Sequence, residues 1–156
     1  MKYLIIFAML LLPAIPSMGQ SPAIDDFFTK YKQSDDAVSL SIGRVLIHIG
    51  SWFIEDPAAR SIARKAKHLR LLSSENQNMV DPKDIEILKD ELYIDGFESL
   101  MTVRSEGSLL EILGRDDRDV LRNLILLMNE EDEFALVSIK CKMTYDELQQ
   151  LISQIE

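Results

Sequence analysis

Residues that build most metal and catalytic centres are scarce in this 156-residue chain, which holds one cysteine and two histidines. Zinc sites need several histidine, cysteine or carboxylate ligands that converge on one point, and His48, His68 and Cys141 do not have ligand spacing. One cysteine also cannot form a disulfide within the chain. The sequence therefore predicts no metal site, no cofactor, and a fold that depends on its hydrophobic core.

Simpler roles are predicted for these residues. His48 lies in an apolar segment and is expected to be a hydrogen-bonded core or boundary residue, whereas His68 is expected to be exposed. Cys141 falls on the apolar side of a predicted strand, which favours a buried and inert thiol. Aromatic residues make up only 7% of the chain, and Trp52 is assigned to core packing by default.

Glycine-dependent motifs are absent too. The six glycines are isolated and form neither of the phosphate-binding patterns G-x-G-x-x-G and G-x-x-x-x-G-K-[ST]. No G-x-S-x-G elbow occurs, so a serine nucleophile of that type is disfavoured. Ser73 and Ser74 follow a predicted strand, where backbone hydrogen bonding is the common role of serine. Catalytic residues therefore remain unknown from the sequence.

Acidic residues are abundant: 26 aspartates and glutamates against 17 lysines and arginines give a net charge of −9. Such a surface repels nucleic acids and anionic lipids. The clusters Asp116-Asp117-Asp119 and Glu130 to Glu133 are predicted to be solvated turns, with weak calcium binding after Asn129 as an alternative. The pairs Glu98/Glu106 and Asp116/Asp119 could in principle act as acid and base. Such a role depends on the distance between the two carboxylates in the folded protein, which the sequence does not supply.

The first residues have the order of a secretory signal. Lys2 precedes the apolar run Leu4 to Leu12, and the small residues Ser17 and Gly19 follow Pro13. The run is shorter than the roughly 20 apolar residues that span a bilayer, and no cysteine is placed for lipid attachment. We therefore expect a cleaved signal peptide at 1–19, one α+β domain at 20–156, a periplasmic or secreted location, and no stable membrane anchor.

Periodicity predicts the elements of that domain. Helices are expected at 24–31, 44–53 (buried), 57–66, 82–95 and 145–155, and strands at 38–42, 69–72, 97–104, 109–114, 120–128 and 134–143. Gly96 is expected to end its helix in a left-handed conformation, and Thr144 with Glu147 is a capping box. Helices alternate with the first strands, and a run of hairpins follows. This order predicts a two-layer α+β sandwich, with a mixed or mainly antiparallel sheet and helices packed on one face.

Several segments in order resemble domain-of-unknown-function family 4252, a family of small exported proteins of Gram-negative bacteria. They are Asp26 to Tyr31, Val38 to Ile42, Leu69 to Glu75, Gly96 to Met101, and Glu131 to Ile139. The resemblance implies an envelope location and one α/β domain, but no catalytic or binding residue. Many relatives look like lipoproteins, and some resemble neighbours of sigma and anti-sigma systems, a hint toward envelope signalling.

These observations favour a non-enzymatic binding or regulatory module of the cell envelope, with an envelope protein as partner. The alternative is an exported hydrolase whose carboxylate pair is assembled only in the fold. The oligomeric state is unknown from the sequence.

Overall fold

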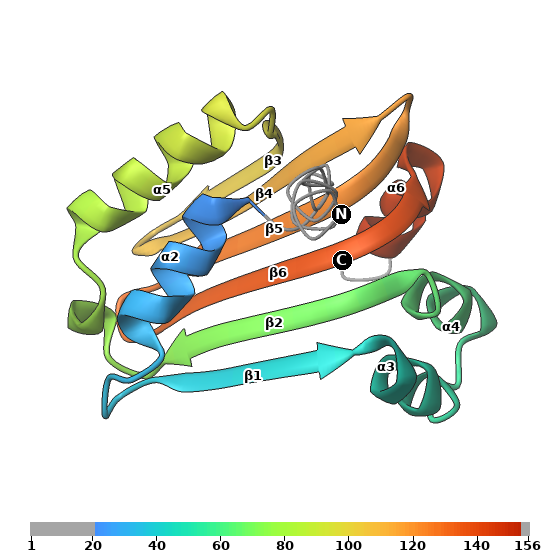
Figure 1. Cartoon of the computed structure of the whole chain (residues 1–156), viewed down its shortest axis with the longest axis horizontal. Coiled ribbons are helices and arrows are strands. Elements are labelled where there is room, and N and C mark those ends of the chain that lie inside the picture. The colour runs from blue at the N-terminus through green and yellow to red at the C-terminus, as the bar shows by residue number, and fades with distance from the viewer. Residues whose placement is uncertain (1–20, 154–156) are drawn as a thin grey trace, which may run out of the picture.

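A six-stranded antiparallel sheet forms the centre of the computed structural model, which describes residues 21–153 (Figure 1). The strand order is β1-β2-β6-β5-β4-β3. The strands are β1 (Val38–Gly43), β2 (Ala66–Ser74), β3 (Glu98–Ser105), β4 (Ser108–Asp117), β5 (Val120–Asn129) and β6 (Phe134–Thr144). The predicted leader, 1–19, lies outside the described residues.

Helices flank the sheet, so the predicted α+β sandwich is confirmed. They are α2 (Pro22–Tyr31), α3 (Arg44–Ser51), α4 (Pro57–Ala63), α5 (Pro82–Ile94) and α6 (Tyr145–Ser153), with a 3₁₀ turn at Gln77–Met79. Both long helices begin at a polar cap followed by proline: the side chain of Ser21 accepts from the Ala23 N–H, and that of Asp81 accepts from the Lys83 N–H. Proline suits this position because the N–H group that proline lacks would have no hydrogen-bond partner within the helix there.

The helix ends also follow the sequence signals. Gly96 has a φ of +88° just after α5, and the Phe97 N–H donates to the Leu92 carbonyl, which closes the helix in a Schellman arrangement. At α6 the Thr144 N–H donates to Glu147 Oε2 at 2.9 Å, and the Glu147 N–H donates to Thr144 Oγ1 at 3.3 Å. Both predictions are confirmed.

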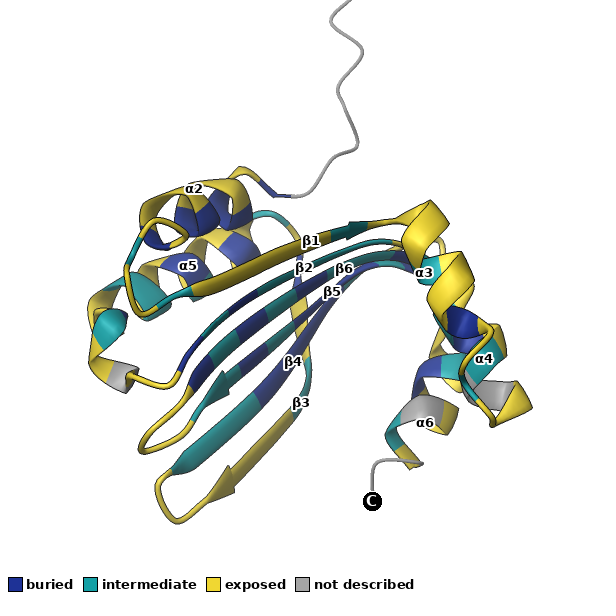
Figure 2. Cartoon of the chain, turned by 90° about the horizontal axis from the view of Figure 1, so that it is seen from below, coloured by how far each residue is buried: buried dark blue, intermediate teal, exposed yellow. Residues whose placement is uncertain are grey.

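Helices α2 and α5 lie together on one side of the sheet, which we call the covered face (Figure 2). Its core joins both helices to alternate residues of four strands. The helix residues include Ile24, Phe27, Phe28, Leu88 and Leu92, and the strand residues are Leu72, Leu113, Ile125, Leu127, Phe134 and Leu136. Helices α4 and α6 form a second, smaller core with the far end of the other side, through Ile62 and Leu148.

Bulges bend the sheet along a line that crosses it. Register shifts occur between Ala66 and His68, between Leu121 and Asn123, between Arg115 and Asp116, and between Ser99 and Met101. A bulge bends its strand and increases the local twist, and neighbouring strands carry these bulges at similar levels. The sheet therefore arches, with α3, α4 and α6 at one end of the arch (Figure 2).

The apolar segment after β1 is helical but is not buried, so that part of the prediction is wrong. Only Ser51 of α3 is buried, while Val45 is 73%, Trp52 61% and Phe53 82% exposed. His48 is exposed as well, and its ring lies edge-on to Trp52 at 6.2 Å. The helix stands at the end of the sheet, where too little of the molecule surrounds it to cover its apolar side chains.

Candidate functional site

The carboxylate pairs considered from the sequence do not form an acid–base site. Glu98 begins β3 and Glu106 follows its end, so the length of the strand separates them. Asp116 hydrogen-bonds with the Tyr145 side chain, and burial together with this bond raises the pKa of the tyrosine. Asp119 lies in the tight β4–β5 turn with a φ of 65°. The hydrolase alternative gains no support from these positions.

The acidic run Glu130 to Glu133 forms the β5–β6 turn, in which all four side chains are exposed and the Glu130 N–H donates to the Glu133 carbonyl. No group of three or more His, Cys, Asp or Glu side chains within residues 21–153 is arranged to hold a metal ion. The run therefore forms a solvated turn, as predicted. Nor does any helix in this part of the chain have the length and apolarity needed to cross a membrane.

Cys141 is buried in β6, as predicted, and its thiol faces the Leu121 carbonyl at 3.7 Å. Burial raises the pKa of this thiol from 9.0 to about 11, although the nearby charges of Lys67 and Arg122 oppose the shift. Because the thiolate is the nucleophile, the fold makes this cysteine unreactive.

We expect the native protein to react with a thiol reagent such as 5,5′-dithiobis(2-nitrobenzoate) at pH 8 about 100-fold or more slowly than the urea-unfolded chain. Two pKa units remove about that fraction of thiolate, and burial adds a steric barrier. The absorbance of the released thiolate measures both rates. Similar rates for folded and unfolded protein would contradict the buried position.

The side of the sheet opposite α2 and α5 is apolar across all the strands, and we call it the open face. One row of directly paired residues consists of Leu40, Leu71, Val137, Leu126, Ile112 and Met101. The next row ends in Val38 on β1 and in Val103 on β3, which are 61% and 42% exposed. Leu40 is 47% exposed, Leu71, Val137, Leu126 and Met101 are partly exposed, and Ile112 is buried in the second core.

Strand β6 shows how the two faces differ. Phe134, Leu136 and Ser138 point to the covered face and are buried, whereas Val137 and Ile139 on the open face are only partly buried. Helices α4 and α6 reach only one end of the open face (Figure 2). Monomeric soluble proteins rarely leave a large contiguous apolar surface uncovered, so such a surface marks an interaction site.

Exposed carboxylates border the open face at the end away from α4 and α6. The chain turns at this end, between α2 and β1, after β2, between β3 and β4, and between β5 and β6 (Figure 1). The carboxylates in these turns are Asp35, Asp36, Glu75, Glu106, Glu130, Glu131, Asp132 and Glu133. The surface therefore combines an apolar floor with an acidic end.

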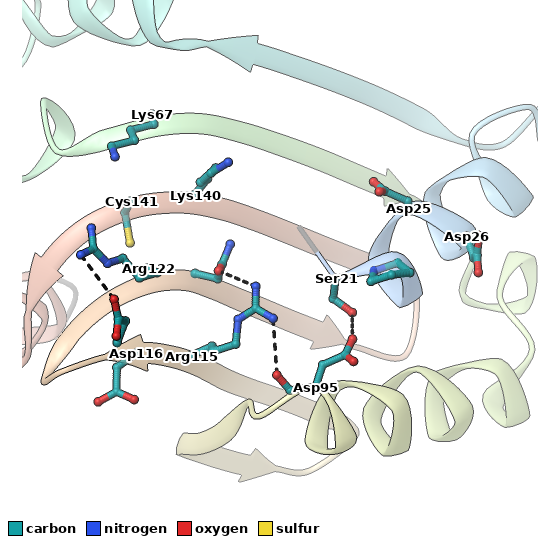
Figure 3. Close-up of a pocket in the computed structure, with 13 residues that line it drawn as sticks. Ser21, Asp25, Asp26, Lys67, Asp95, Arg115, Asp116, Arg122, Lys140 and Cys141 are labelled. Atoms are coloured by element: carbon teal, nitrogen blue, oxygen red, sulfur yellow. Dashed lines mark hydrogen bonds and ion pairs between the residues drawn. The ribbon is translucent and has the colours of Figure 1, made fainter. Parts of the chain in front are cut away.

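A second candidate is a groove of about 1020 Å³ on the covered face, where the bulges bend the sheet beside α2 (Figure 3). Four cationic side chains line it, each from a different strand: Lys67 from β2, Arg115 from β4, Arg122 from β5 and Lys140 from β6. Sequence analysis did not identify this cluster, because no local motif links the four residues. Only the adjacent bulges place them together.

A comparison with protein-family models identifies the family of this chain. The model of a domain of unknown function, DUF4252, matches residues 31–151. The chain belongs to this family. Neither curated proteins nor solved structures gave a match.

The matched DUF4252 region contains all six strands, α3 to α5, most of α6, the whole open face and the four groove cations. Most of α2 precedes it, so Ser21, Pro22, Asp25 and Asp26 of the groove lie outside the match. The suspected family membership is thus confirmed, and both candidate surfaces are features of the DUF4252 region.

Proposed function

We propose that this protein is an exported, non-enzymatic binding module of the cell envelope, and that its open face binds a protein segment with apolar side chains followed by basic residues. The apolar row that crosses all six strands is the observation that carries the proposal. Burying that row in a complex removes apolar surface from water, which is the main favourable term in most protein associations.

The chemistry of the partner follows from the borders of the open face. Carboxylates at the turns favour lysine or arginine on whatever lies at that end, because complementary charges fix orientation and raise the association rate. The apolar floor favours leucine-like side chains above β6 and β5. A segment with both features makes apolar contacts on the floor and ion pairs at the turns, whereas an acidic segment is repelled at the turns.

Export is supported by the order of charge, apolar run and small residues in 1–19. Intact-mass analysis of protein from a periplasmic or culture fraction is expected to show a chain that begins at Gln20. Protein that retains Met1 and is recovered only from the cell interior would contradict export, while leaving the binding surface to be tested separately.

Fluorescence anisotropy with two labelled amphipathic peptides tests the open face. One peptide carries leucines followed by lysines, and the other carries the same leucines followed by glutamates. We expect saturable binding of the lysine peptide only, and Leu40→Lys is expected to weaken it about tenfold or more because a charge enters the apolar contact.

Ser39→Lys is the matched control, since Ser39 is also exposed on β1 but points to the other side of the sheet. It is expected to leave the affinity within about twofold, and both variants are expected to unfold at the temperature of the parent because neither site is buried. Equal binding of the two peptides, or equal loss in both variants, would contradict the proposal.

A further inference from the structure

The groove lies on the covered face, because Ser21, Pro22 and Asp25 at the start of α2 line it, so the sheet separates it from the proposed docking surface. Carboxylates outnumber cations by 26 to 17 in the whole chain, and by five to four among the residues that line the groove. Four cations from four strands nevertheless meet in one concavity (Figure 3). Placing like charges together costs free energy unless something neutralises them.

Most of the carboxylates that also line the groove already have a polar partner, which for Asp117 is the groove cation Arg122. Asp25 pairs with Arg70, Asp95 accepts from the Ser21 hydroxyl, Asp117 lies 3.8 Å from Arg122, and Asp116 hydrogen-bonds with Tyr145. Asp26 lies on α2, away from the lysines (Figure 3). The groove therefore has an acidic rim of Asp25, Asp26 and Asp95 beside α2 and α5, whereas Asp116 and Asp117 lie on β4 among the cations of the floor.

Two of the cations have no partner among the described residues. Neither Lys67 nor Lys140 makes an ion pair or a side-chain hydrogen bond within residues 21–153, and they project from the adjacent strands β2 and β6. Arg122 is held only loosely by Asp117, at 3.8 Å. Two positive charges on the groove floor are thus left without a counter-charge.

Arg115 provides a fixed side of the groove. Its guanidinium donates to Asn123 Oδ1 at 3.0 Å and to the Asp95 carbonyl at 3.4 Å, and it lies 4.9 Å from the centre of the Phe97 ring. Asn123 is itself buried. A cation held by such contacts loses little freedom when it receives a ligand.

We propose that this groove binds a small ligand that carries a phosphate monoester, with Lys67, Lys140 and Arg122 around the phosphate. A phosphate monoester has close to two negative charges at neutral pH, which matches the two uncompensated lysines, whereas one carboxylate supplies half of that charge. The net charge of −9 repels nucleic acid and anionic bilayers, so a small ligand fits the molecule better than a polyanion.

Isothermal titration of the mature protein with inorganic phosphate, and with acetate under the same conditions, tests this site. We expect saturable phosphate binding that acetate does not reproduce. The double variant Lys67→Gln/Lys140→Gln is expected to lose about tenfold or more in affinity, the loss that follows removal of charge-assisted hydrogen bonds. Restoring the charges with Lys67→Arg/Lys140→Arg is expected to restore most of the binding.

Lys32→Gln/Lys83→Gln is the matched control, since both lysines are exposed and lie outside the groove. It removes the same charge from the whole protein and is expected to leave phosphate binding unchanged. Absence of saturable binding, equal affinity for acetate, or an equal loss in the control variant would overturn the proposal. Binding of vesicles that contain phosphatidic acid, but not of free phosphate, would also overturn it, because the ligand would then be a membrane surface.

Discussion

Lys89→Met is expected to destabilise the protein by about 3 kcal/mol, because it leaves a buried carboxylate without its counter-ion. Lys89 Nζ lies 2.7 Å from Oε2 of Glu111, whose side chain is only 5% exposed on the covered face beneath α5. The Tyr93 hydroxyl donates to the other oxygen, Oε1, at 3.2 Å. That bond alone cannot offset the charge of a carboxylate removed from water.

Urea unfolding followed by circular dichroism measures this effect, with Lys83→Met as the control. Lys83 lies on the same helix but is exposed and outside the ion pair, so its replacement is expected to change the free energy of unfolding by less than about 0.5 kcal/mol. Adding Glu111→Leu to Lys89→Met is expected to recover much of the lost stability, because the unpaired charge is removed. An equally small effect of both lysine variants would show that Glu111 is not buried.

Leu136→Ala is expected to cost about 3 kcal/mol, and Val137→Ala about 1 kcal/mol or less. The two residues are neighbours on β6 but face opposite sides of the sheet: Leu136 is fully buried against the α2 and α5 layer, whereas Val137 lies partly exposed on the open face. The same unfolding experiment measures both costs. A cost for Val137→Ala close to that of Leu136→Ala would mean that something covers the open face in the free protein.

The alternation of β6 illustrates what the sequence could and could not predict. Its period of two correctly indicated a strand with two faces and placed Cys141 on the apolar one, but it did not show which face α2 and α5 would cover. In the structure the more buried side holds Phe134, Leu136 and Ser138, because α2 and α5 pack there. Periodicity assigns residues to a common face, whereas tertiary packing decides which face is covered.

The segment after β1 was misjudged for a related reason. Val45, Trp52 and Phe53 are as apolar as core residues, so burial was the natural expectation. Burial depends on what surrounds a segment, and α3 stands at the end of the arch. Capping signals were more dependable, as Gly96, Thr144 and Glu147 show, because they act within a few residues of one another.

The groove cations lay beyond sequence reasoning altogether. Lys67 and Lys140 lie on strands that are far apart in the chain, and no local motif links them. Their proximity depends on β2 pairing with β6 and on the irregular register between Ala66 and His68. One-residue irregularities of this kind follow from the packing of the whole sheet.

The open face as a docking surface is tested most directly by photo-cross-linking in the native cell. A photoreactive phenylalanine analogue is introduced in place of Leu40 or Val137, with Ser39 as the control position, and the cross-linked peptides are mapped by mass spectrometry. We expect cross-links from both open-face positions to one protein segment that combines apolar residues with lysine or arginine, and no such product from position 39. Equal cross-linking from all three positions, or open-face cross-links only to acidic segments, would contradict the account.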